Sequence, residues 1–179
     1  MSMPVCKFSL WPIDKSMKSY YNKPRKYEFI LGGHMKTKIS GKIHRINYLI
    51  AELDALYHQA SLKLGLTDSA SIVLYTICDN GEDCRLSDIY KQSGVSKQTV
   101  NSAIRNLEKK HMIYLEPYSG RTKKVILTEA GKDYVQKTTA RLMEAEVAAF
   151  STWTEEEINA HIALIKKYIH SFQEQVEKL

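Results

Sequence analysis

The most regular feature of the sequence is a stripe of apolar residues that advances in alternating steps of four and three between Ile39 and Leu64. Because an α-helix makes one turn in about 3.6 residues, this spacing keeps the whole stripe on one face. Its members are Ile39, Ile43, Ile46, Ile50, Leu53, Tyr57, Ala60 and Leu64. The pattern predicts a long amphipathic helix, which Gly65 ends.

A second stripe with the same spacing occupies the C-terminal end of the chain and follows Thr154, which has Glu157 three residues on as a capping box. It consists of Ile158, Ile162, Ile165, Ile169, Phe172, Val176 and Leu179. Two narrow seams of this kind favour the packing of helix on helix and predict pairing with a second copy of the chain. We therefore expect a homodimer; in the alternative, the two terminal helices pack on each other within a monomer.

A shorter helix is predicted after Gly65, with Asp68 or Ser69 as its N-cap. Its apolar residues Ala70, Val73, Leu74 and Ile77 share one face, and Asn80 and Gly81 end it as a turn. This segment has the pattern of a simple core helix.

Two further short helices follow, joined by a tight turn at Ser93, Gly94 and Val95. We predict Ser87 as the cap of the first helix, which contains Ile89 and Tyr90, and Ser96 as the cap of the second. On the second helix, Val100, Ala103, Ile104 and Leu107 form a buried face, and Gln98, Asn101, Ser102, Arg105 and Lys109 form the opposite polar face. This arrangement is typical of a helix-turn-helix, whose second helix enters the major groove of DNA.

A β-hairpin with a basic tip is predicted directly afterwards. Residues 112–115 and 125–127 read as two short strands, and the connection between them carries a turn at Ser119 and Gly120. Arg121, Lys123 and Lys124 follow the turn and are placed to contact the DNA backbone or a narrow minor groove. A helix-turn-helix followed by a basic hairpin is a winged helix.

The predicted contacts with DNA divide into base readers and phosphate contacts. Gln98 and Asn101 are candidates for bidentate bonds to adenine and Arg105 for guanine, whereas Lys97 and Thr99 are better placed for phosphate. The full predicted DNA-binding set is Ser96, Lys97, Gln98, Thr99, Asn101, Ser102, Arg105, Arg121, Lys123 and Lys124.

Charge is concentrated in the same block. The chain has 179 residues and a formal net charge of +6, and residues 86–128 alone carry 8 Lys and Arg against 3 Asp and Glu. A local excess of cations is the pattern expected where a protein meets a polyanion, because counterion release favours each phosphate contact.

Composition and the absence of known motifs argue against several classes of protein. With 44% apolar residues and no long apolar run, the chain is predicted to be globular and not to enter a membrane. Its 3 cysteines form no disulfide or metal framework, which favours a cytoplasmic location. No nucleophile motif, phosphate-binding loop or metal-ligand set is present, so we expect neither an enzyme, nor a metal site, nor a cofactor.

We divide the chain into three regions. Residues 1–34 are expected to be an unstructured leader, with Met35 as the natural start; a basic arm that reaches onto nucleic acid is the alternative. Residues 67–128 form the predicted winged helix-turn-helix, and residues 35–66 and 129–179 the predicted helical dimerisation region. The expected fold is therefore mainly α, with a small β-hairpin wing.

The order of these elements resembles the MarR family of bacterial transcription regulators over about residues 36–179. The resemblance rests on Leu66 and Thr67, on the run from Gly94 to Val100, on Leu107 to Lys110, and on Leu127 to Gly131. It implies a homodimeric regulator, a repressor or activator, on a pseudo-palindromic operator. His111 departs from the glycine usual in the family, and the wing has Arg121 after Ser119 and Gly120 in place of the usual Asp-x-Arg.

The resemblance also implies an effector, a small phenolic or lipophilic ligand or an oxidant, between the dimer helices and the winged domain. Tyr48, Tyr57 and His58 are candidates to line such a pocket, although aromatic residues at helical spacing are also typical of core packing. Cys84 is the cysteine expected to be exposed. Two other functions stay open: a winged-helix module for protein contacts, and non-specific binding of nucleic acid.

Overall fold

The computed structural model describes residues 38–81, 84–120 and 122–179. The predicted leader, residues 1–34, lies outside this part of the chain, as does Arg121. The chain divides between Ile50 and Ala51 into two units, and the boundary falls inside helix α2 (Lys38–Lys63). The first unit is therefore described only through the N-terminal half of α2, and the second contains all other elements.

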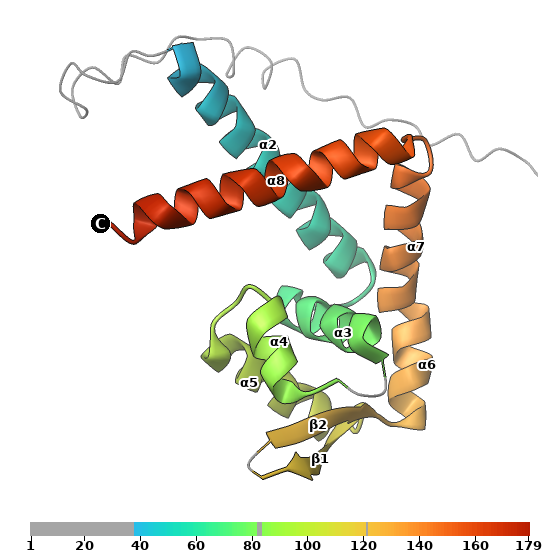
Figure 1. Ribbon diagram of the computed structural model, residues 1–179. Helices are drawn as coiled ribbons and strands as arrows, with labels where there is room; N and C mark the ends of the chain where they lie inside the picture. Colours follow the sequence, from blue (N-terminus) through green and yellow to red (C-terminus); the bar gives the residue numbers. More distant parts are fainter. Residues whose placement is uncertain (1–37, 82–83, 121) are drawn as a thin grey trace, which may run out of the picture. The chain divides into compact units, whose positions relative to one another are not determined.

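The second unit is built around a winged-helix core (Figure 1). Helices α3 (Asp68–Asn80), α4 (Leu86–Gln92) and α5 (Lys97–Lys109) pack together with the hairpin of β1 (Ile113–Ser119) and β2 (Thr122–Leu127). The predicted apolar faces supply this core. Its buried members are Leu66, Val73, Leu74, Ile77, Cys84, Ile89, Val100, Ala103, Ile104, Leu107, Ile113 and Val125.

The start of α3 differs from the prediction. Thr67, and neither Asp68 nor Ser69, is the N-cap, because its side-chain oxygen accepts a hydrogen bond from the backbone N–H of Ala70 at 3.3 Å. The Asp68 carboxylate instead lies 2.8 Å from Nδ1 of His58. The end of α3 follows the prediction, with Gly81 at φ 65°, a left-handed value that glycine adopts without strain.

The start of α4 also corrects the prediction. Ser87 lies inside the helix, and Arg85 occupies the N-cap position without a side-chain capping bond. Arg85 is held there by an isolated antiparallel bridge to Lys124 of β2, and the helix begins two residues earlier than a Ser87 cap would set it. In contrast, Ser96 caps α5 as predicted: its Oγ accepts from the Thr99 N–H at 3.1 Å.

The hairpin extends further toward its tip than the apolar pattern indicated. Its antiparallel register pairs Ile113 with Leu127 at the base and Ser119 with Thr122 at the tip, with a bulge after Pro117. The residues expected to form a loop are therefore mostly strand. Gly120, at φ 56°, supplies the left-handed conformation of the predicted turn.

The hairpin leads into helices α6 (Glu129–Lys137), α7 (Thr139–Phe150) and α8 (Glu155–Val176). Thr128 joins β2 to α6: its side chain caps the helix at Gly131 N–H and donates to the carbonyl of His111 at 2.6 Å. At the start of α8, Thr154 and Glu157 form both bonds of the predicted capping box.

The two amphipathic stripes keep their apolar side chains in solvent in the single chain. None of the side chains of α8, all of which are described, is buried. The exposed apolar residues of α8 include Ile162, Ile165, Ile169, Phe172 and Val176, and those of α2 include Ile43, Ile46, Ile50, Leu53 and Tyr57. Within the described ranges, no helix has the length and apolarity needed to cross a membrane.

Candidate nucleic-acid interface

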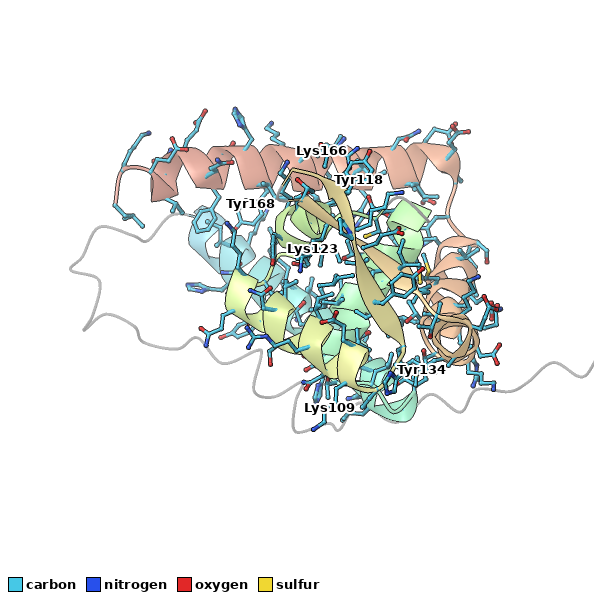
Figure 2. The ribbon with its side chains drawn as sticks, turned by 90° about the horizontal axis from the view of Figure 1, so that it is seen from below. Lys109, Tyr118, Lys123, Tyr134, Lys166 and Tyr168 are labelled. Atoms are coloured by element: carbon cyan, nitrogen blue, oxygen red, sulfur yellow. The ribbon has the colours of Figure 1, made fainter. Side chains whose placement is uncertain are left out.

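Helix α5 has one buried apolar face and one exposed polar face. Val100, Ala103, Ile104 and Leu107 are at most 3% exposed. Around the helix from them, Gln98, Ser102, Arg105 and Lys109 are exposed, and Asn101 is half-buried. Figure 2 shows Lys109 at the C-terminal end of this helix and Lys123 and Tyr118 on the hairpin. The polar face of α5 and the hairpin therefore belong to one compact unit.

The hydroxyls at the start of α5 hold the helix end together. Ser96 Oγ accepts from the Thr99 N–H and lies 2.9 Å from the Thr99 hydroxyl. The unpaired N–H groups and the helix dipole at this end favour an anion, and Lys97 adds a full positive charge beside them. Ser96 and Thr99 are thus brought together with Lys97, with Ser96 serving as the cap.

Asn101 has a partner that the sequence pattern did not reveal. The Tyr90 hydroxyl on α4 donates a hydrogen bond to Asn101 Oδ1 at 2.6 Å. The ammonium of Lys97 lies 5.7 Å from the centroid of the Tyr90 ring, within the range of a cation–π contact. Tyr90 was predicted only as part of the first helix, because a single aromatic residue gives no periodic signal of a hydrogen bond to the next helix.

The hairpin forms the centre of a second group of contacts that the sequence pattern did not predict. Arg85 Nη2 donates to the Tyr118 hydroxyl at 3.2 Å, and its guanidinium carbon lies 4.7 Å from the Tyr118 ring centroid. The ammonium of Lys124 lies 5.2 Å from the same ring. Tyr118, next to the tip pair of the hairpin, therefore gathers two cations, and we call this group the Tyr118 cluster (Arg85, Tyr118 and Lys124). Only Lys124 was predicted, since Arg85 precedes the basic block and Tyr118 was assigned to the turn.

A cleft of about 550 Å³ lies elsewhere in the same unit, between α2, α3, α4 and α7. Its lining includes Tyr57 and His58, two of the three predicted pocket residues. Tyr48 precedes this unit and occupies an exposed position on α2. The complete lining is Asp54, Tyr57, His58, Ser61, Asp68, Ser71, Ile72, Tyr75, Thr76, Gln92, Ser93, Leu142 and Glu146.

The carboxylate of Glu146 accepts hydrogen bonds from two tyrosines that line this cleft. Tyr57 donates to Glu146 Oε1 at 2.5 Å, and Tyr75 donates to Glu146 Oε2 at 2.8 Å. We call this arrangement the Glu146 clasp (Tyr57, Tyr75 and Glu146), and it joins α2, α3 and α7. Burial, reinforced by the bond to Glu146, raises the pKa of Tyr75 to about 12 and that of Tyr57 further above its usual 10.

The cysteines reverse the expectation that Cys84 is exposed. Cys84 is fully buried in the core, whereas Cys78 is partly exposed. Burial is the main cause that raises the pKa of Cys84 to about 11, and it raises the pKa of Cys78 as well. A thiol that reacts with oxidants needs a lowered pKa and access, so the environment of Cys84 is that of a core residue.

Comparison with known proteins points to one family. Residues 64–121 match the model of the MarR family. The structure is similar to NMB1585, a MarR family regulator from Neisseria meningitidis, with a TM-score of 0.69 at 19% identity over 76% of this chain and 97% of that one. MepR of S. aureus in a DNA complex gives 0.56 at 25% identity over 72% and 96%.

A third similar structure is BpsR of Bordetella bronchiseptica, whose DNA binding is regulated by 6-hydroxynicotinic acid. Its TM-score is 0.53 at 21% identity, over 69% of this chain and 98% of that one. Among curated proteins, no sequence matches the chain. The matched segment, residues 64–121, contains α3, α4, α5 and the first strand of the hairpin, β1.

Proposed function

We propose that the protein is a homodimeric, sequence-specific DNA-binding repressor of the MarR family, whose model its residues 64–121 match. The observation that carries the proposal is the exposed polar face of α5 beside the cationic hairpin. The 25% identical MepR, whose structure is a DNA complex, supports it. An α-helix of this kind fits the major groove, and a basic hairpin fits the backbone beside it.

The residues take separate roles in this proposal. Gln98 and Arg105 are exposed on α5 and read base edges, and Ser102 lies between them on the same face. Lys97 and the N–H groups near Ser96 and Thr99 contact phosphate. On the hairpin, Lys123 and the two cations of the Tyr118 cluster hold the wing to the DNA backbone. The sequence adds Arg121 to this set.

The exposed apolar stripes of α2 and α8 support a homodimer. Contiguous apolar surface of this extent is typical of a protein–protein interface, because water leaves it on association. A second copy presents the same stripes and two recognition helices, one for each half-site. Half-sites about 10 base pairs apart, centre to centre, then match the symmetry of the protein. Repression is favoured over activation because blocking polymerase needs no additional contact surface.

The cleft is the site proposed for an effector. Its described lining carries three carboxylates, Asp54, Asp68 and Glu146, together with His58, and no Lys or Arg. Negative charge disfavours an acidic phenol and favours a neutral or cationic lipophilic ligand. A ligand that takes the place of the tyrosine hydroxyls at Glu146 would open the Glu146 clasp and change how α2, α3 and α7 are joined.

The effector proposal is tested with two ligands of similar size and opposite charge. Benzyltrimethylammonium is expected to bind and to alter affinity for DNA, whereas benzoate is not. Glu146→Gln removes the charge while keeping the side-chain size, and it should weaken binding of the cation. Equal binding of both ligands, or binding that Glu146→Gln leaves unchanged, contradicts the assignment of ligand class without touching the proposal of DNA binding.

The DNA-binding proposal is tested by selecting duplexes from a random library with the full chain. The selected duplex and a scrambled duplex are then compared by fluorescence anisotropy at two salt concentrations. We expect at least about 10³-fold tighter binding to the selected site. Gln98→Ala combined with Arg105→Ala should remove this preference, and the matched pair Gln136→Ala with Arg141→Ala on α6 and α7, both exposed, should keep it.

The outcomes separate the alternative functions. Equal, salt-sensitive binding to both duplexes identifies a non-specific nucleic-acid binder and contradicts base readout by α5. Binding to neither duplex favours a winged helix that contacts another protein. The dimer is checked independently by sedimentation, with Ile165→Glu on α8 expected to give monomers because it places a charge in the apolar stripe.

A further inference from the structure

The hydrogen bond between Tyr90 and Asn101 links the first helix of the helix-turn-helix to the recognition helix. Both side chains are half-buried, and the Tyr90 hydroxyl lies 2.6 Å from Asn101 Oδ1. The phenolic O–H is the donor and the amide oxygen the acceptor. The planar amide of Asn101 is therefore anchored on its oxygen side, which leaves its Nδ2 group as the side that bonds a base.

This anchoring changes what Asn101 reads. Bidentate recognition of adenine requires the amide oxygen to accept from the adenine N6 amino group while Nδ2 donates to N7. With Oδ1 directed at the Tyr90 hydroxyl, one of its two lone pairs is occupied and its direction is fixed, which disfavours the first of these bonds. Guanine presents two adjacent acceptors, N7 and O6, and suits a side chain that offers only N–H donors.

We infer that Tyr90 is a specificity-determining residue that holds Asn101 as a donor, so that Asn101 selects guanine over adenine in the major groove. The inference rests on the proposed function of α5 as the recognition helix. It revises the expectation that Asn101 pairs with adenine, and it assigns a role to Tyr90 that the sequence pattern did not indicate.

Lys97 strengthens the same preference. Its ammonium lies 5.7 Å from the centroid of the Tyr90 ring, and Lys97 precedes Asn101 by four residues on α5, so both lie on one side of the helix. Positive charge favours the acceptor-rich edge of guanine over the edge of adenine, which carries an amino group. Rotating the Asn101 amide to read adenine would place Nδ2 against the Tyr90 oxygen and leave the phenolic O–H without its acceptor, an unfavourable exchange.

The test measures base preference in the selected operator, with every base pair replaced in turn. Asn101→Ala first identifies the base pair that Asn101 reads, as the position at which discrimination collapses. At that position the wild-type chain should prefer guanine to adenine by about fivefold or more, the lower end of what a good base contact gives. Tyr90→Phe keeps the ring and frees the amide oxygen, so it should shift the preference toward adenine by a similar factor.

A second variant tests the same geometry by changing the outward group. In Asn101→Asp, one carboxylate oxygen still accepts from Tyr90 and the other faces the groove as an acceptor. The preference should then move to cytosine, whose N4 amino group donates. Tyr134→Phe, in a half-buried tyrosine of α6, is the matched control for loss of a hydroxyl and should leave the base profile unchanged.

Three results overturn the inference. They are a wild-type preference for adenine at the Asn101 position, a Tyr90→Phe profile identical to the wild type, and an Asn101→Ala chain that keeps all its base preferences. In each case the chain still binds a selected operator, so the proposed function survives. Failure of the wild type to select any operator overturns both the inference and the proposed function.

Discussion

The backbone of Gly131 on α6 passes so close to the carbonyl oxygen of Met112 that a β-carbon at position 131 would overlap that oxygen. The same carbonyl accepts the N–H of Thr128 at 3.0 Å, and Thr128 caps α6 at Gly131. The approach ties the end of the hairpin to the start of α6. It also explains why the run from Leu127 to Ala130 is followed by a glycine.

Replacing Gly131 should therefore weaken the fold. Gly131→Ala forces backbone to move at the junction of the hairpin and α6, and we expect a loss of about 1–3 kcal/mol in the free energy of unfolding. Urea denaturation measures it. Gly41→Ala is the control, because Gly41 lies in a helix with open space around it and should gain stability. A Gly131→Ala chain as stable as the wild type would contradict the close approach.

Replacing His111 by glycine should stabilise the folded chain. His111 is the one non-glycine residue of the described chain with positive φ, at 55°. A side chain in this left-handed region costs about 1–2 kcal/mol, partly offset because glycine is more flexible when unfolded. We expect His111→Gly to raise the free energy of unfolding by about 0.5–1 kcal/mol. Lys110→Gly, at φ −85°, should lower it instead.

Arg85 should contribute to DNA affinity without changing sequence preference. Its guanidinium lies over Tyr118 beside Lys124, which places it among the cations of the wing. Arg85→Ala should weaken binding to specific and scrambled duplexes alike and reduce the slope of log affinity against log salt by about 1. Lys178→Ala, a charge change at the exposed C-terminal end of the chain, is the control. A loss confined to the specific duplex would assign Arg85 to base readout.

The charge of Glu146 should affect the pKa values of the two tyrosines in the Glu146 clasp. The pKa of Tyr75 is raised to about 12 from its usual 10, so the folded state favours the protonated phenol. The resulting stabilisation is fully present below pH 10 and is lost as the pH rises from 10 toward 12. Spectrophotometric titration of Glu146→Gln should show Tyr75 ionising closer to pH 10 than in the wild type, because the carboxylate charge is gone.

Tyr75→Phe and Tyr57→Phe assign the absorbance change to each residue in that titration. An unchanged titration curve in Glu146→Gln would show that burial alone raises these pKa values. It would also show that the charge of Glu146 does not act on the two tyrosines.

Much of this molecule follows from the sequence because its signals are local and periodic. The apolar stripes predicted α2, α5 and α8, the capping box predicted the start of α8, and Ser96 predicted the start of α5. Each of these depends on residues within a few positions of one another. The order of the helix-turn-helix and the basic hairpin predicted the winged helix in the same way.

Tertiary structure decided the features that join residues far apart in the chain. Arg85, the N-cap residue of α4, pairs with Lys124 of β2, and Cys84 is buried by packing of the core. The bonds from Tyr90 to Asn101 and from Tyr57 and Tyr75 to Glu146 have no periodic signature. Periodicity reports which face of a helix is apolar, but the partner of a polar side chain depends on how elements meet, and that is decided only when the core packs.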